Sequence, residues 1–485
     1  MQTPKTHAAL KPSVILLTFI ATLGGLLFGY DSAVISGVVH SLRVVFVDPQ
    51  HLSPDAAASS LGVIVSSALI GCIIGALSGA WVSTRLGRKR GLIIAAVLFL
   101  VSSLGSSMPE LGFAALGSAG PAYYWNFVVY RILGGIGIGL ASMLSPMYIA
   151  EIAPARVRGN LVAWNQMAIV IGVVGVYFVN YGIARASGTD NDTWINATGW
   201  RYMLASCTIP SALFLILLTF VPETPRYLML KGREADARRV LDRLGTPEET
   251  EHELTEIRAS LAEHHSGKLF SFGALVVVVG ILLSAFQQFV GINVVIYYAP
   301  EIFKSMGLGT NTSLLQTVII GIVNMLFTLV AIFTVDRWGR KSLQIVGAIV
   351  MAAAMFGLGL DLTLGDKGLM ALAFMLLFCA GFSMSWGPVV WVLLSEIYPN
   401  QIRGKGMAVA VAAQWISDYL VSWSFPILKD NPTLQAHFNG GFPYFIYSGM
   451  GVLAAIFMWK LVPETKGRTL EEMEHLWLKK SPPRE

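Results

Sequence analysis

The chain has 485 residues and a formal net charge of +5; 54% of its residues are hydrophobic, 13% are charged, and the mean hydropathy is +0.63. A soluble domain carries about a quarter of charged residues, so this composition excludes an ordinary soluble protein and makes the lipid bilayer the first expected partner. The basic excess lies mainly in short loops between apolar segments, where it is typical of membrane topology, so nucleic acid is not expected as a partner.

Apolar segments of about 20 residues, the length that crosses a bilayer as a helix, recur along the chain. Because the charged loop motifs of the first half return in the second, they predict an all-α membrane protein with two pseudo-symmetric six-helix bundles. The twelve expected spans are 14–39, 58–83, 90–108, 124–150, 161–184, 202–222, 270–299, 313–335, 342–362, 368–395, 405–427 and 441–461. The expected divisions are a first bundle at 1–222, a cytoplasmic helical linker at 223–269, a second bundle at 270–462 and a cytoplasmic tail at 463–485.

The first segment carries Asp31 and is too long and too rich in glycine for a cleaved signal peptide, so we interpret it as the first span. Asp31 and Arg131, in the fourth span, are charges inside the membrane, which are costly, usually paired and often functional. A change in the distance between a carboxylate and a guanidinium alters proton affinity. This pair is therefore our candidate for proton coupling, with a purely structural ion pair as the alternative.

Charged motifs mark the same end of both halves. Arg85-Leu86-Gly87-Arg88-Lys89 returns as Arg337-Trp338-Gly339-Arg340-Lys341, and Glu151-Ile152-Ala153-Pro154 returns as Glu396-Ile397-Tyr398-Pro399. Because Lys and Arg collect in cytoplasmic loops, both termini are predicted to be cytoplasmic. The same charges predict a latch of ion pairs that holds the inner side closed, with topology signalling alone as the alternative. The latch residues are Arg85, Arg88, Glu151, Arg158, Glu223, Arg337, Arg340, Glu396 and Arg403.

Residues 224–268 are polar and separate the two sets of spans. Thr246-Pro247-Glu248-Glu249 combines a capping threonine, a proline at the first helical position and a glutamate at the third. Leu254, Ile257 and Leu261 then mark one helical face. The segment is predicted to be a helical linker without a catalytic domain, long enough to let the bundles rock against one another.

Uncharged polar residues lie inside several spans, where lipid penalises them unless they face a cavity or each other. Amides offer donors and an acceptor that match the hydroxyls of a neutral sugar, and tryptophan rings offer flat apolar faces for its C–H surfaces. We therefore interpret these residues as the lining of a monosaccharide site, although amides can also simply join helices. The expected sugar contacts are Gln166, Gln287, Gln288, Asn293, Asn324, Trp391, Gln414 and Trp415.

Two spans carry helix-breaking residues close to these amides. Gly291 follows the paired glutamines, Pro300 is expected to end the seventh span, and Gly387-Pro388 is expected to interrupt the tenth. A broken helix is tolerated inside a membrane where it lines a cavity. The breaks are therefore candidate gates, and a kink without a gating role is the alternative.

Several motifs, in this order, resemble the sugar porter family of the major facilitator superfamily, over residues 14 to 475. They are Arg85–Lys89, Pro222-Glu223-Thr224-Pro225-Arg226, Gln287-Gln288-Phe289-Val290-Gly291-Ile292-Asn293, Gly387-Pro388 with Trp391, and Pro463-Glu464-Thr465-Lys466-Gly467-Arg468. The resemblance implies that the amides contact sugar, that Tyr297 and Tyr298 help close the outer side, and that Gly387 and Pro388 help close the inner side. Within the family, Phe28-Gly29-Tyr30-Asp31 and Ala413-Gln414-Trp415 resemble bacterial D-xylose:proton symporters more than facilitative glucose carriers.

Three residues depart from that symporter pattern. Cys207 stands where the resemblance implies a second membrane carboxylate, and Asp418, four residues after Gln414 on the same helical face, stands where it implies an asparagine. We take Asp418 as a possible modifier of the proton or sugar site, with a helix-end residue facing water as the alternative. Val173, two turns after Gln166, replaces an expected amide and could leave room for the hydroxymethyl group of a hexose.

These patterns predict a proton-coupled symporter that imports D-xylose, a hexose such as D-glucose, or both, by alternating access. An uncoupled facilitator is the first alternative, although it need not bury Asp31 and Arg131; a sugar sensor and a proton-driven drug exporter are weaker ones. The sequence holds no nucleotide loop, metal cluster or nucleophile constellation, so no enzyme activity, cofactor or metal is expected. The protein is expected to work as a monomer in a bacterial cytoplasmic (inner) membrane, with a neutral monosaccharide and a proton as partners.

Overall fold

The computed structural model describes residues 11–154, 157–188, 191–262, 269–365, 369–399, 401–466 and 477, and these contain helices and no strand. The first bundle holds α1 (Pro12–Val34), α2 (Val39–Leu42), α3 (Pro54–Arg85), α4 (Arg88–Ser107), α5 (Tyr124–Ile152), α6 (Arg158–Ala186), α7 (Asp192–Trp194), α8 (Trp200–Ala205) and α9 (Thr208–Thr219). The linker holds α10 (Pro225–Leu230), α11 (Glu234–Leu244) and α12 (Pro247–Ala262). The second bundle holds α13 (Ala274–Phe289), α14 (Ile292–Ser305), α15 (Thr310–Trp338), α16 (Arg340–Leu364), α17 (Leu369–Met384), α18 (Trp386–Ile397), α19 (Arg403–Asp430), α20 (Pro432–Phe438) and α21 (Phe442–Lys460).

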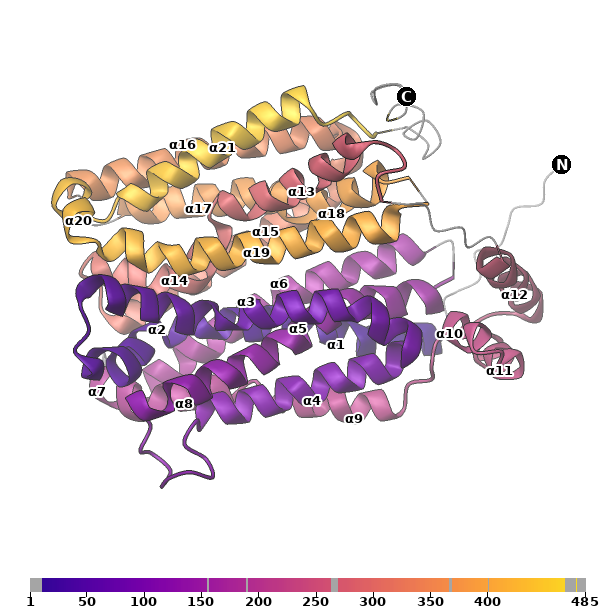
Figure 1. Ribbon diagram of the computed structural model, residues 1–485, viewed down its shortest axis with the longest axis horizontal. Helices are drawn as coiled ribbons and strands as arrows, with labels where there is room; N and C mark the ends of the chain where they lie inside the picture. The colour runs from indigo at the N-terminus through magenta and orange to yellow at the C-terminus, as the bar shows by residue number, and fades with distance from the viewer. Residues whose placement is uncertain are drawn as a thin grey trace.

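The two bundles lie side by side with their long helices roughly parallel (Figure 1). Helices α10 to α12 lie at one end of the molecule, which we call the linker end. The short helices α2, α7 and α20 lie at the opposite end, which we call the distal end. Helix α19 of the second bundle packs along α3 of the first, and α15 packs along α6, so these four helices form much of the contact between the bundles.

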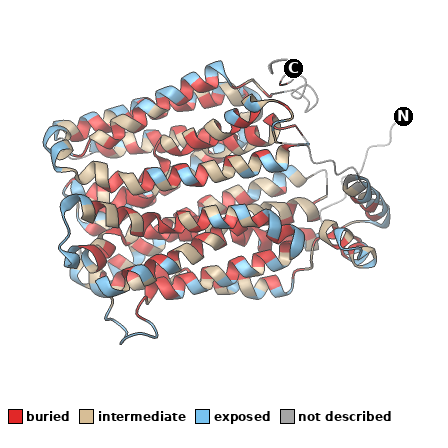
Figure 2. Cartoon of the chain, viewed as in Figure 1, coloured by how far each residue is buried: buried red, intermediate tan, exposed pale blue. Residues whose placement is uncertain are grey.

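Twelve segments cross the molecule, as the sequence predicts. Among the described residues, eleven helices or helix pairs are long and apolar enough to span a membrane. Helix α19 is the twelfth; it has 28 residues, and polar side chains such as Gln414 and Asp418 lower its hydropathy. Figure 2 shows buried residues along almost the whole length of the spans, whereas the linker helices are mostly exposed or half-buried. Large apolar side chains such as Trp81 and Phe333 are exposed on the spans and suit contact with lipid.

The linker is helical, and its predicted cap is confirmed. The Thr246 backbone N–H donates to Glu249 Oε2 over 2.8 Å, and the Glu249 N–H donates to Thr246 Oγ1 over 3.3 Å. This reciprocal pair satisfies donors that would otherwise be unpaired at the start of α12. The Lys11 ammonium also donates to the Gly245 carbonyl, so the loop before α12 is tied to the start of the first span.

The seventh span breaks at Gly291 as expected, but its end and the position of the break in the tenth span differ from the prediction. The prediction that Pro300 ends the seventh span is wrong, because α14 continues through Pro300 to Ser305. The carbonyl that a proline frees is that of the residue four positions earlier, and the Ile296 carbonyl accepts a hydrogen bond of 2.9 Å from the Tyr177 hydroxyl of α6. In the tenth span the break falls at Ser385, so Gly387 and Pro388 lie in the first turn of α18.

Four glycines allow α3 and α5 to approach closely. Gly71 and Gly75 on α3 face Gly135 and Gly139 on α5, and a Cβ atom on any of them would collide with backbone atoms of the opposite helix. Small residues spaced by four positions are the usual means of close helix packing in membranes, where dispersion contacts replace the hydrophobic effect.

Replacing Gly135 with alanine is therefore expected to lower the thermal stability of the purified protein. The new methyl group would meet the Ala68 backbone carbonyl, which cannot move aside as a flexible side chain would, and overpacking of this kind costs about 1–3 kcal/mol. Gly175→Ala on α6 is the matched control, because its Cβ would enter open space. Equal unfolding temperatures for the two variants would contradict the close contact.

Candidate functional site

Three of the predicted amides form a hydrogen-bonded chain at the break of the seventh span. Asn293 Nδ2 donates to Gln288 Oε1 over 2.7 Å, and Gln288 Nε2 donates to Gln287 Oε1 over 3.4 Å. Gln287 Nε2 then donates to the backbone carbonyls of Trp386, over 2.8 Å, and Gly387, over 3.2 Å. The chain thus links α13 and α14 to the break between α17 and α18.

Gly291 makes this arrangement possible. Its φ angle is +93°, a left-handed conformation that favours glycine, and a Cβ there would also meet the Tyr447 ring. The break ends α13 at Phe289 and restarts the helix at Ile292, which brings Asn293 back beside Gln288. Sequence reasoning placed the break correctly but could not identify the carbonyls of Trp386 and Gly387 as its partners.

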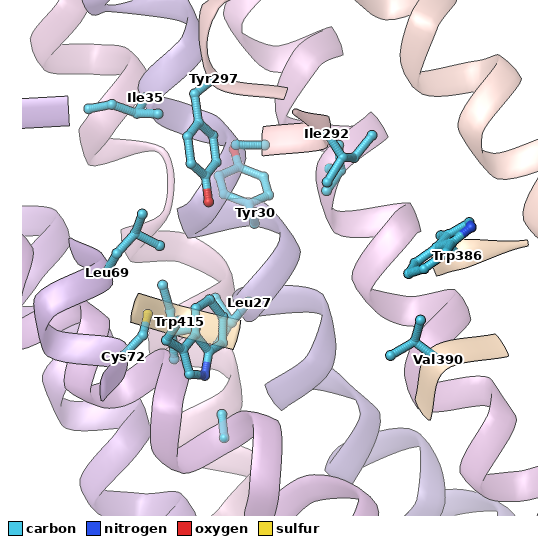
Figure 3. Close-up of a cluster of buried hydrophobic side chains, with 14 of the residues drawn as sticks. Leu27, Tyr30, Ile35, Leu69, Cys72, Ile292, Tyr297, Trp386, Val390 and Trp415 are labelled. Carbon is cyan, nitrogen blue, oxygen red and sulfur yellow. The ribbon is translucent and has the colours of Figure 1, made fainter. Parts of the chain in front are cut away.

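The remaining predicted sugar contacts are placed on other helices and are not joined to this chain. Asn324 Oδ1 accepts a 2.6 Å hydrogen bond from Ser383, and Gln166 and Trp391 are half-buried. Gln414 and Trp415 are buried on α19, with Gln414 Oε1 and Trp415 Nε1 unpartnered within the described part of the chain. The Trp415 ring lies 5.6 Å from that of Phe28 of the first bundle, and Figure 3 shows it beside Leu27 and Cys72.

The predicted pair between Asp31 and Arg131 is confirmed. Arg131 Nη1 donates to Asp31 Oδ1 over 3.0 Å, and Nη2 donates to the Asp31 carbonyl over 3.2 Å. Both side chains are only 2% exposed. Asp31 Oδ2 has no hydrogen-bond partner among the described residues, so the carboxylate keeps a free site for a proton. Cys207 is also buried.

Two of the residues that depart from the symporter pattern, Val173 on α6 and Asp418 on α19, are both buried. Val173 is 6% exposed. Asp418 is 1% exposed and lies in the middle of α19, so the alternative in which it faces water at a helix end is wrong. The reason is that α19 extends to Asp430, about three turns beyond Asp418.

Contacts between the bundles gather at the distal end. Arg43 Nη1 lies 3.0 Å from Asp430 Oδ2, and Lys304 Nζ lies 3.3 Å from Asp192 Oδ2; each pair joins the first bundle to the second. The hydrogen bond from Tyr177 to the Ile296 carbonyl does the same. The distal end is therefore closed. Sequence reasoning missed these pairs, because their partners lie more than 100 residues apart.

Comparisons with known proteins decide the family. The family model described as "Sugar (and other) transporter" matches residues 17–477. The D-xylose-proton symporter of Escherichia coli is 56% identical over 469 residues, which cover 95% of each chain. The chain belongs to the sugar transporter family. The glucose facilitated diffusion protein of Zymomonas mobilis is 42% identical over 464 residues, covering 95% of this chain and 97% of that protein. An inward-open structure of the E. coli xylose transporter matches with 54% identity and a TM-score of 0.86, covering 96% of this chain and all of that one.

The predicted outer gate residues, Tyr297 and Tyr298, lie on the helix that carries the end of the amide chain. Tyr297 and Tyr298 follow Asn293 on α14 and are buried. The Tyr298 hydroxyl donates to the Ser422 carbonyl over 2.9 Å, which is the carbonyl freed by Pro426 in α19. Figure 3 shows the Tyr297 hydroxyl directed toward the level of Trp415 and Cys72. Two tyrosines of the transporter, Tyr177 and Tyr298, thus satisfy carbonyls that prolines release in α14 and α19.

The charged motifs form ion pairs inside each bundle of the transporter. Arg88 Nη2 lies 2.7 Å from Glu151 Oε1, and Arg340 Nη2 lies 3.1 Å from Glu396 Oε1. Arg158 instead lies 3.5 Å from Glu253 of the linker. Arg403 Nε donates to the Tyr398 carbonyl over 3.4 Å, and Arg85 and Arg337 are exposed. In this conformation the pairs brace each bundle, and a role as a latch stays a prediction.

Glu223 caps α4 from outside that helix. Its carboxylate accepts from the backbone N–H groups of Arg88, over 3.0 Å, Lys89, over 3.2 Å, and Thr224, over 2.9 Å. Glu464 accepts from Arg340 and Lys341 in the same way at the start of α16, a role that the repeated Pro-Glu-Thr motif could have indicated. Burial raises the pKa of Glu223 above its ordinary value, although the three N–H donors oppose this.

We expect this pKa to make stability depend on pH. A carboxyl whose pKa is raised on folding binds its proton more tightly in the folded state. The wild type should therefore gain thermal stability relative to Glu223→Gln as the pH falls from about 7 toward about 5, and lose that gain as the pH rises again. Thermal unfolding in detergent measures this difference. Glu248→Gln, at an exposed position of α12, is the control, and a pH-independent difference for Glu223→Gln would contradict the prediction.

Proposed function

We propose that this protein imports a neutral monosaccharide, D-xylose or a hexose such as D-glucose, together with a proton. The observation that carries the proposal is the buried Asp31–Arg131 pair, with its 3.0 Å contact and its unpartnered Asp31 oxygen. Removing both charges of this pair from water is costly, so the pair is a candidate for function. Protonation of Asp31 would release Arg131 from it. Relatives of this protein are named as proton symporters of D-xylose, arabinose and galactose.

The sugar is proposed to bind between the bundles, along the amides. One side of the sugar would meet the hydrogen-bonded chain of Gln287, Gln288 and Asn293. One N–H and the side-chain oxygen of Asn293 take no part in that chain and could bind a hydroxyl. Trp391 and Trp415 would supply apolar faces for the sugar ring. Gln166, Asn324 and Gln414 would complete the set, with Val173 giving an apolar wall that admits a hydroxymethyl group. A solved structure of the E. coli xylose symporter holds 6-bromo-6-deoxy-D-glucose, a hexose analogue, and supports this range of ligands.

Orientation follows from the loop charges. We infer that the linker end and both termini are cytoplasmic and that the protein works as a monomer in a bacterial inner membrane. The closed distal end is then the outer side, and the conformation faces inward. In the outward-facing state the charged motifs around Arg88 and Arg340 would act as the inner latch, and Tyr297, Tyr298, Gly387 and Pro388 as gates.

One experiment separates this proposal from its rival, an uncoupled facilitator. Lightly buffered, energy-depleted cells that overproduce the protein receive D-xylose, D-glucose or D-galactose in turn while the external pH is recorded. Alkalinisation with a sugar identifies both the substrate and proton coupling. Protein-dependent entry of labelled sugar without a pH change would instead support facilitated diffusion, which is the activity in the name of the Zymomonas relative.

A further inference from the structure

Asp418 is a second carboxylate buried at the contact between the bundles, and the proton pair does not use it. It lies on α19, four residues after Gln414, and is 1% exposed. Its Oδ1 accepts a 3.0 Å hydrogen bond from Ser422, while Oδ2 has no hydrogen-bond partner among the described residues. One oxygen is therefore fixed and the other is available.

The groups that surround Asp418 come from three helices and do not neutralise it. Asn293 and Tyr297 of α14 and Cys72 of α3 lie close enough to interact with its carboxylate. Arg131 lies close enough to interact with Cys72 and Tyr297, and Asp31 already engages it at 3.0 Å. Among the described residues, no Lys or Arg forms an ion pair with Asp418. An ionised Asp418 would thus be a buried charge without a cation, which is costly, and a bound proton removes that cost.

Asn293 is where a proton on Asp418 would affect the sugar site. One N–H of the Asn293 amide is already donated to Gln288, so its second N–H and its oxygen remain. An ionised Asp418 only accepts, and it would take the second N–H, leaving the oxygen for a ligand. A protonated Asp418 can donate to that oxygen, which leaves the N–H for a ligand instead.

We propose that Asp418 is a second proton-binding residue and that its protonation selects which hydrogen-bonding group Asn293 offers to the sugar. The proposal rests on the proposed function, in which Asn293 contacts sugar. Asp418 is a positioning residue here: Asp31 on the first bundle would couple transport to the proton gradient, and Asp418 on the second would set sugar affinity. A neutral sugar brings no cation to an ionised Asp418 and adds to its burial, so the protonated form should bind sugar more tightly.

Sugar affinity as a function of pH tests the proposal. The dissociation constants of D-xylose and D-glucose are measured in detergent at about pH 6 and about pH 9, for Asp31→Asn and for Asp31→Asn with Asp418→Asn. In the single variant we expect affinity to weaken about tenfold as the pH rises, a typical size for coupling between sites. The double variant should show no such change. A flat profile in the single variant, or an unchanged slope in the double variant, would overturn the proposal.

A second measurement does not depend on sugar. Infrared difference spectra between the same two pH values detect the carbonyl stretch of a protonated carboxylic acid. Asp31→Asn should retain a band that Asp418→Asn removes, with Asp55→Asn at an exposed position as the control. The absence of that band would contradict proton binding by Asp418, even if sugar binds. If no sugar binds the wild type, the proposed function fails and the band still decides the protonation of Asp418. Asp418→Ser replaces the asparagine variant if the latter folds poorly.

Discussion

Asp31→Asn is expected to abolish uphill sugar accumulation while leaving exchange of sugar across the membrane intact. The asparagine keeps an oxygen that can accept from Arg131 Nη1, so the local structure should survive, but it cannot bind and release a proton at neutral pH. With one proton per sugar, each pH unit across the membrane supports about a tenfold accumulation. The variant should therefore equilibrate its sugar at a ratio of about one.

The measurement uses proteoliposomes with an imposed pH gradient. Labelled sugar is followed to its plateau, and exchange is followed in parallel with sugar on both sides and no gradient. Asp55→Asn, at an exposed position at the start of α3, is the matched control and should accumulate sugar as the wild type does. Undiminished accumulation in Asp31→Asn would remove Asp31 from the coupling mechanism and leave its pair with Arg131 as a structural one.

The features predicted correctly from the sequence are those that obey local rules. The capping pair of Thr246 and Glu249 lies three residues apart, and its hydrogen bonds form as expected. The pairing of Asp31 with Arg131 needed only the rule that charges inside a membrane find partners. Eleven of the twelve spans needed only length and hydropathy.

The features that the sequence could not predict depend on partners from distant parts of the chain. Pro300 was expected to end a helix, but the Tyr177 hydroxyl of the other bundle satisfies the carbonyl that Pro300 releases, so α14 continues. The contact between Arg43 and Asp430 joins residues 387 positions apart. Neither position carries a local signal for its partner. The roles of the site residues stay predictions, since they require a ligand.

The closed distal end depends on Gly62, which suggests how the protein could be held in the opposite conformation. Gly62 lies on α3 of the first bundle, and a Cβ there would collide with the backbone carbonyl of Trp423 on α19 of the second. The Trp423 indole N–H also donates to Ser59 Oγ over 3.3 Å across the same contact. A side chain at position 62 would therefore collide with α19 while the distal end is closed.

Gly62→Trp is therefore expected to reduce sugar uptake to background while sugar binding is retained. The indole would act as a wedge between α3 and α19 and hold the distal end open, because the observed state with a closed distal end brings their backbones into contact. Uptake of labelled sugar by cells and equilibrium binding to the purified protein separate the two effects. Gly449→Trp on α21 is the control, since its Cβ would enter open space, and it should transport normally. Normal uptake by Gly62→Trp would mean that the bundles do not alternate about this contact, whereas loss of binding as well would point to misfolding and would show in the unfolding temperature.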